Sequence, residues 1–200
     1  MGILIKHDRE LNYCLFDIPY IREHQEEIIN AAETSVEKIN TLCNSNKTDV
    51  TWFYRYYNIF SINTGNVHFY KIYSEIIDCL TQYFDLCKIS YDNQLWMQSW
   101  LNYHSLDQVL SRHDHDSPIN GFLSIDPKNT DTVYYYQHTD SVLYTIENKI
   151  GQLYIGPGKT DHEVKVLKPF EGKRITVAFD IEDQESINLG LIPILLQQKK

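Results

Sequence analysis

The spacing of apolar residues along this chain changes near residue 90, from a helical period to a period of about two. From Val67 to Phe84, apolar side chains recur three or four positions apart, which predicts an amphipathic helix. An earlier helix is predicted to start at Asp17-Ile18-Pro19, because proline favours the first helical turn. Its apolar positions are Ile28, Ile29, Ala32, Val36, Ile39 and Cys43.

Short segments rich in aromatic and β-branched residues predict strands. One of them, Trp52–Ile62, precedes the long helix, and the others follow residue 90. The later strands are predicted at Gln94–Tyr103, Ile119–Ile125, Thr132–Gln137, Val142–Ile146, Ile150–Ile155, His162–Leu167 and Arg174–Ile181. Many short strands in succession favour a sandwich or jelly roll. We therefore expect a mainly β protein with flanking helices (α+β), in which the helices pack on one outer face of the sheet.

The length and composition suit a single domain spanning residues 1–200. We expect residues 1–90 to supply helices and a strand that flank the core, and residues 91–185 to form the jelly-roll core. The net charge of −9 disfavours non-specific binding to nucleic acid, because that affinity comes mainly from Lys and Arg. The four cysteines form no C-x-x-C pair, and no signal peptide or membrane-length apolar run is present. A cytoplasmic protein without membrane contact is therefore expected.

Potential metal ligands are concentrated in the run Arg112-His113-Asp114-His115-Asp116. If this run is extended, His113 and His115 share one face, and Asp114 and Asp116 share the other. The run alone would also suit a solvated loop. His162 and Arg174, each in a predicted strand, extend the pattern. Two close ligands, a distant histidine and a basic residue indicate a metal site that also holds a small carboxylate.

Four segments in the second half of the chain carry a family resemblance. They are Trp96–Tyr103, then His113-Asp114-His115 shortly before Asn120-Gly121-Phe122-Leu123, then Gly151–Gly158 leading into His162-Glu163-Val164, and finally Lys173–Phe179. In this order they resemble the Fe(II)/2-oxoglutarate-dependent oxygenase superfamily, closest to its small prolyl-hydroxylase-like, phage and bacterial members. The resemblance covers roughly residues 94–181. It implies a double-stranded β-helix (jelly roll) and a hydroxylase that couples substrate oxidation to decarboxylation of 2-oxoglutarate to succinate.

The resemblance also implies roles for individual residues. His113, His115 and His162 would be the Fe(II) ligands, and Arg174 would bind the far carboxylate of 2-oxoglutarate. Fe(II) held by three protein ligands keeps positions open for the keto acid and O₂. Most family members have a carboxylate where His115 stands, so a bulged strand could instead turn Asp116, or Asp114, toward the metal.

Other polar residues have weaker assignments. Asn102 and Tyr103 lie on a strand expected to line the site, so either could contact 2-oxoglutarate, although core packing is an equal interpretation of Tyr103. His104 and His138 are expected at the surface or beside the ligands.

Two other classes of protein remain open. One is a three-histidine, cupin-type dioxygenase without a keto acid, which would have no need of Arg174 as a carboxylate anchor. The other is a non-catalytic jelly roll used for binding or assembly. A zinc hydrolase is disfavoured, because no glutamate is obviously placed as a base beside the ligands.

The primary substrate is unidentified at this stage and could be a protein side chain, a nucleobase or a small metabolite. Loops 105–112 and 128–140 are expected to select it. The phage-like resemblance is compatible with a viral protein acting in a bacterial cytoplasm.

Overall fold

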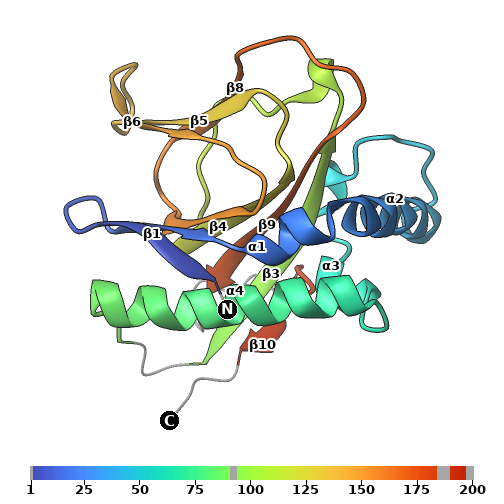
Figure 1. Ribbon diagram of the computed structural model, residues 1–200, viewed down its shortest axis with the longest axis horizontal. Helices are drawn as coiled ribbons and strands as arrows, with labels where there is room; N and C mark the ends of the chain where they lie inside the picture. Colours follow the sequence, from blue (N-terminus) through green and yellow to red (C-terminus); the bar gives the residue numbers. More distant parts are fainter. Residues whose placement is uncertain (1, 91–93, 184–189, 197–200) are drawn as a thin grey trace.

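A computed structural model describes residues 2–90, 94–183 and 190–196 of the chain. Within these residues, β-strands form two antiparallel sheets, and helices precede most of the strands along the sequence (Figure 1). The strands are β1 (Ile3–Asp8), β2 (Tyr13–Asp17), β3 (Leu95–His104), β4 (Ile119–Asp126), β5 (Thr130–Tyr135), β6 (Val142–Glu147), β7 (Gln152–Pro157), β8 (His162–Val166), β9 (Arg174–Glu182) and β10 (Ile194–Leu196). The helices are α1 (Pro19–Glu23), α2 (Gln25–Leu42), α3 (Ile59–Ile62) and α4 (Val67–Cys87), with 3₁₀ turns η1 (Thr51–Phe53) and η2 (Leu106–Gln108).

The larger sheet has seven strands in the order β1-β2-β7-β4-β9-β3-β10, and the smaller sheet has the order β6-β5-β8. Strands far apart in sequence are interleaved, since β4 lies between β7 and β9 and β9 lies between β4 and β3. The register pairs Arg174 with His104 and Thr176 with Asn102. Because directly opposed residues point to the same face, these four side chains share one side of the larger sheet.

The two faces of the larger sheet have different neighbours, as consecutive residues of β2 show. Tyr13 stacks on Tyr144 of the smaller sheet, with ring centroids 4.6 Å apart. Tyr134 of β5 stacks on Tyr144 and contacts Tyr154 of β7, so a tyrosine cluster joins the two sheets. Cys14, the next residue of β2, points to the opposite face, where α4 lies near β2 and β7.

Helices α2 and α4 follow the apolar pattern that predicted them. Along α4 the side chains of Ile72, Ile76 and Leu80 are buried, and Asn66 caps the helix by accepting hydrogen bonds from the next turn. In Figure 1, α4 crosses beneath the β1–β2 edge, while β5, β6 and β8 lie on the other side of that edge. No helix among the described residues is long and apolar enough to cross a membrane.

The prediction of a strand at Trp52–Ile62 is wrong. This segment instead forms η1, an irregular stretch and α3. Asp49 accepts a hydrogen bond from the backbone of Thr51, and Asn58 caps α3 by accepting one from Phe60 N. These bonds from side chains to the local backbone compete with an extended backbone, so aromatic content alone did not determine the conformation.

Three strands were not predicted individually: β1, β2 and β10. β1 is an edge strand with mostly exposed side chains, so it shows no burial-driven alternation. The other strands lie within a few residues of their predicted positions.

Truncation of Ile76 tests how far α4 supports the sheet. Ile76→Ala should lower the free energy of unfolding by about 2–5 kcal/mol, because it removes a fully buried side chain and leaves a cavity. Urea unfolding followed by circular dichroism measures the change. Tyr70→Ala on the exposed side of the same helix is the control and should stay within about 0.5 kcal/mol of the parent protein. Equal effects of the two substitutions would contradict this packing.

Candidate metal centre

Three histidines from two segments meet beside the smaller sheet. His113 and His115 lie in the connection between β3 and β4, and His162 is the first residue of β8. The backbone N–H of His113 donates to the carbonyl of His162 at 2.9 Å, and the reverse bond is 2.8 Å long. His115 N donates to the carbonyl of Gly158 at 3.1 Å. Residues 113–115 are thus held antiparallel to residues 158–162.

The imidazoles converge, whereas the neighbouring carboxylates do not. One ring nitrogen from each of His113, His115 and His162 lies within 4.8 Å of the other two. Asp114 and Asp116 are exposed between and beyond them. The same-face prediction for two residues separated by one therefore agrees with the positions of the histidine side chains, although this segment is not a regular strand.

Each imidazole uses its Nδ1 atom in a separate hydrogen bond. His113 Nδ1 lies 2.7 Å from the Ser111 carbonyl, and His162 Nδ1 lies 3.0 Å from the Thr160 carbonyl. His115 Nδ1 lies 2.8 Å from Asp180 Oδ1. A carbonyl or carboxylate at Nδ1 fixes the tautomer that has a lone pair on Nε2. This is the arrangement in which histidines bind a metal ion.

The electrostatics differ among the three rings. Burial lowers the pKa of His113, and burial together with the neighbouring imidazoles lowers the pKa of His162 well below its ordinary value. Burial also disfavours the charged form of His115, but Asp180 outweighs burial and raises the pKa of His115. His113 and His162 are therefore neutral at neutral pH, as metal ligands must be.

Aromatic side chains limit the movement of the rings. Trp100 stacks on His115 with centroids 5.9 Å apart, and Tyr134 stacks on His162 at 5.2 Å. Both aromatic residues are buried. Preorganised ligands lose little conformational entropy when an ion binds.

Arg174 lies in the floor of a narrow cavity between the two sheets. The cavity has a volume of about 40 Å³, and its lining includes the three histidines, Arg174, Asn102 and Thr176. Arg174 is only 2% exposed, and burial lowers its pKa to about 10. Within the part of the chain that the structure describes, its Nε and Nη1 atoms have no hydrogen-bond partner. A buried cation with unused donors indicates a place for an anion.

A larger cavity of about 360 Å³ opens on the outer side of the cluster. It shares Trp100, His113 and His115 with the narrow cavity, and it also includes Trp52 and Tyr54 of the 51–55 segment. Its volume lies within the range of small-molecule sites, about 300–1,000 Å³. Of the two loops expected to select the substrate, residues 110–111 line this cavity, whereas no residue of 128–140 is among its lining residues.

Asn102 and Tyr103 lie on opposite sides of β3. Asn102 lines the narrow cavity and donates to Thr176 Oγ1 at 3.0 Å. Tyr103 points toward α2, where its hydroxyl donates to Glu33 at 3.3 Å. The expectation that Tyr103 contacts a bound co-substrate therefore does not hold, because alternation along the strand turns it away from the cavity.

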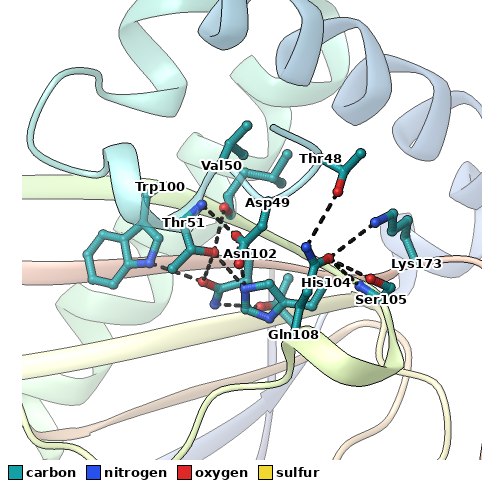
Figure 2. Close-up of polar contacts among 12 residues, drawn as sticks. Thr48, Asp49, Val50, Thr51, Trp100, Asn102, His104, Ser105, Gln108 and Lys173 are labelled. Carbon is teal, nitrogen blue, oxygen red and sulfur yellow. Dashed lines mark hydrogen bonds and ion pairs between the residues drawn. The ribbon is translucent and has the colours of Figure 1, made fainter. Parts of the chain in front are cut away.

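A buried polar network supports the floor of the cavity, and Figure 2 shows its members. The hydroxyl of Thr51 lies 3.1 Å from Asn102 Oδ1 and 2.7 Å from His104 Nε2. His104 Nε2 also lies 3.3 Å from Asp49 Oδ1. His104 is fully buried, which excludes the surface alternative of its two predicted positions, whereas His138 is exposed in a turn, one of the two positions expected for it. The network connects β3 to the segment that lines the larger cavity.

Asp180 and the 51–55 segment were not identified from the sequence as parts of the site. A signal for Asp180 was present, because residues 174, 176, 178 and 180 of β9 share one face. The 51–55 segment gave no such signal, since its aromatic residues resembled those of a strand. Its position depends on the hydrogen bonds of Asp49 and Thr51.

Comparisons with known proteins give distant likenesses only. No protein-family model and no curated protein sequence matches this chain. A crystal structure of IDO from Bacillus thuringiensis aligns with a TM-score of 0.42 and 10% sequence identity, over 56% of this chain and 55% of that chain. An oxidoreductase of the 2OG-Fe(II) oxygenase family from Burkholderia pseudomallei aligns with a TM-score of 0.44 and 13% identity, over 55% and 54%. A non-haem monooxygenase, ThoJ, in complex with nickel aligns with a TM-score of 0.38 and 11% identity, over 54% and 49%.

This chain spans about half the length of each of these structures. Likenesses this distant assign no activity to it, and the chemistry of the site must come from its own residues. Imidazole nitrogens suit Fe(II) as well as Zn(II), Cu(II) and Ni(II). The three histidines, with their Nδ1 atoms engaged, therefore fit a divalent transition metal.

Removal of a converging histidine tests the metal centre. His113→Ala and His162→Ala should each abolish stoichiometric binding of Fe(II) or Mn(II) at neutral pH, because two imidazoles are a poor site. Metal content after dialysis measures the loss. His138→Ala is the matched control, since His138 is exposed in a turn outside the cluster. Full metal content in both ligand variants would rule out the site.

A second pair of variants tests which residue is the middle ligand. His115→Ala should lose the metal, while Asp116→Ala should retain most of it, because Asp116 is exposed and lies outside the converging group. The same dialysis experiment measures both. The reverse outcome would show that the segment rearranges to present the carboxylate when metal binds.

The Asp49–His104 contact should make stability depend on pH. Burial raises the pKa of Asp49, but its hydrogen bond and ion pair with His104 outweigh burial, so the pKa is lowered. Ionised Asp49 therefore stabilises the fold above its unfolded pKa of about 4, and this contribution declines as pH falls through the lower folded value.

Asp49→Asn should accordingly cost about 1.5–3 kcal/mol at neutral pH, and less as the solution is acidified. Urea unfolding at a series of pH values measures the difference between the variant and the parent. Asp107→Asn, at an exposed position, is the control. A difference that does not change with pH would contradict the ionic contribution.

Proposed function

We propose that this chain is an Fe(II)- and 2-oxoglutarate-dependent oxygenase, which couples hydroxylation of a primary substrate to decarboxylation of 2-oxoglutarate to succinate. The observation that carries the proposal is the placement of buried Arg174 in the same narrow cavity as the three histidines. The guanidinium would bind an anion, and the metal ligands would bring a metal ion to the other part of the cavity. A small keto acid with a second carboxylate has the chemistry that both requirements call for, and the cavity of about 40 Å³ would have to widen to admit it.

In this proposal His113, His115 and His162 hold Fe(II), and the bonds at Nδ1 keep their Nε2 atoms directed at it. Fe(II) with three protein ligands would leave positions for the keto acid and O₂ and would supply the oxidising chemistry. Asp180 orients His115, and it also accepts a hydrogen bond from Ser117 at 3.0 Å. Removal of the Asp180 carboxylate would leave the His115 ring without the charged partner that orients it.

The far carboxylate of 2-oxoglutarate would pair with Arg174, whose planar guanidinium matches two oxygens. Thr176 lies two residues along β9 on the same face and lines the same cavity. Its oxygen accepts a hydrogen bond from Asn102, so its own hydroxyl proton can be donated to the carboxylate. Phe122 and Ala178 supply apolar walls that exclude water and strengthen these contacts.

We place the primary substrate in the larger cavity, which reaches His113 and His115 from the side of the 51–55 segment. Trp52, Tyr54 and Trp100 offer aromatic surfaces there, and Asp114 and Asp116 offer carboxylates. A protein side chain, a nucleobase and a small metabolite are the substrate classes to be tested. We also propose that the interleaved sheets form a double-stranded β-helix.

A set of three histidine ligands without a carboxylate also supports one rival, a dioxygenase that acts without a keto acid. In that enzyme Arg174 would have no co-substrate carboxylate to bind. A protein that binds metal but has no catalytic activity is the other alternative. Binding and turnover of 2-oxoglutarate separate all three possibilities.

Substitution of Arg174 tests the carboxylate assignment. Arg174→Ala should weaken 2-oxoglutarate binding to the Mn(II) form by about ten- to a hundredfold, since a hydrogen bond to a charged group contributes about 1.5–3 kcal/mol. Anaerobic calorimetry measures the affinity, and metal content should stay at the parent level. Arg22→Ala is the matched control, because Arg22 pairs with Asp17 at the surface.

The parent protein with Fe(II) and O₂ should also convert 2-oxoglutarate slowly to succinate without a primary substrate. Succinate analysis by mass spectrometry measures this reaction. If the metal binds but 2-oxoglutarate neither binds nor is consumed, the dioxygenase without a keto acid or the non-catalytic protein replaces this proposal.

A further inference from the structure

A second group of metal-binding side chains lies on the other face of the larger sheet. It consists of His7 on β1, Cys14 on β2 and Cys87 at the end of α4. We propose that these three residues form a zinc site, separate from the histidine cluster and independent of the reaction proposed for it. One nitrogen or sulfur atom from each residue lies within 4.8 Å of the other two.

The pairing of β1 with β2 brings two of the ligands together. His7 and Cys14 are directly opposed partners in this antiparallel pair, so their side chains point to the same face. That is the face covered by α4, because Tyr13, the neighbour of Cys14, points instead to the smaller sheet. Cys87, the last residue of α4, then approaches the two strands on that same face.

The distances suit an ion of the size of zinc. The Cys87 Sγ atom lies 3.7 Å from His7 Nε2. A tetrahedral zinc ion with bonds of about 2.3 Å to sulfur and 2.0–2.1 Å to nitrogen holds those two atoms about 3.6 Å apart. The site therefore requires almost no rearrangement of this pair.

The donors and their burial also favour zinc. Two thiolates and an imidazole are a soft set that prefers zinc or Cu(I) over the hard cations Mg²⁺ and Ca²⁺. Cys14 is fully buried, whereas His7 and Cys87 are half-buried. The ion would therefore face the protein interior on the side of Cys14. On the solvent side, a water molecule can serve as its fourth ligand.

Such a site would stabilise β1, an edge strand of the larger sheet. Among the strands that the structure describes, β1 pairs with β2 alone, and Ile3 and Ile5 are 58% and 56% exposed. A bound ion would connect β1 directly to β2 and to the end of α4. Ligands that bind only the folded state raise its stability, so zinc should raise the unfolding temperature.

Cobalt substitution tests the proposal in the full-length protein, because a thiolate bound to Co(II) gives a near-ultraviolet charge-transfer band that histidine ligands do not give. When Co(II) is added to the reduced, metal-free protein, this band should grow until one Co(II) ion is bound at the thiolate site. Zinc should then remove the band. Cys87→Ser and His7→Ala should weaken Co(II) binding at this site by at least about tenfold, as expected for loss of one ligand bond. The histidine cluster makes no contribution to this readout.

Cys43→Ser is the matched control, since Cys43 is also half-buried but lies outside the group, and it should leave the band unchanged. Far-ultraviolet circular dichroism checks that each variant is folded. Absence of the band from the reduced parent protein overturns the proposal, as does a band that Cys87→Ser leaves intact. A Cys14–Cys87 disulfide in freshly isolated protein, together with no Co(II) band after reduction, also overturns it.

Discussion

Burial of the Arg174 charge is the constraint on which the interior between the two sheets depends. Its side chain is enclosed by both sheets, and the lowered pKa of about 10 still leaves it protonated at neutral pH. Placing an unpaired charge in such surroundings costs several kcal/mol, and apolar residues of similar volume would give a more stable core. Retention of this arginine beside three converging histidines favours a role in ligand binding over a role in stability alone.

The polar residues around Arg174 are hydrogen-bonded to one another. Thr176 and Asn102 are hydrogen-bonded to each other, and Asn102 is held in turn by Thr51. The polar network therefore fixes the shape of the cavity floor without neutralising Arg174. The carboxylate of the network, Asp49, lies 3.3 Å from His104 Nε2. An incoming carboxylate would thus meet a guanidinium whose position is already set, which lowers the entropic cost of binding.

The sequence predicted both long helices and most strands, because their side chains have a clear period and one buried side. The same principle placed His113 and His115 on one face, even outside a regular strand, since the bond from His115 N to the Gly158 carbonyl keeps that segment extended. It failed at Trp52–Ile62, where the aromatic residues favoured a strand but hydrogen bonds from Asp49 and Asn58 to the backbone set the conformation. The Nδ1 partners of His113 and His162 are backbone carbonyls, whose directions depend on loop conformations that no residue pattern specifies.

Strand β7 pairs with β2, which carries Cys14, and leads directly to Gly158 beside the histidine cluster. Cys14 on β2 pairs with Ile155 of β7, and three residues later the carbonyl of Gly158 accepts the bond from His115 N. Gly158 passes so close to this segment that a Cβ atom there would lie 2.0 Å from the Ser117 carbonyl oxygen. The backbone at Gly158, the residue directly after β7, therefore lies against the 115–117 segment and bonds to His115 N, with no room for a side chain between them. Because β2 pairs with β7, an anchored β1–β2 edge would support the strand that leads into Gly158 through backbone hydrogen bonds.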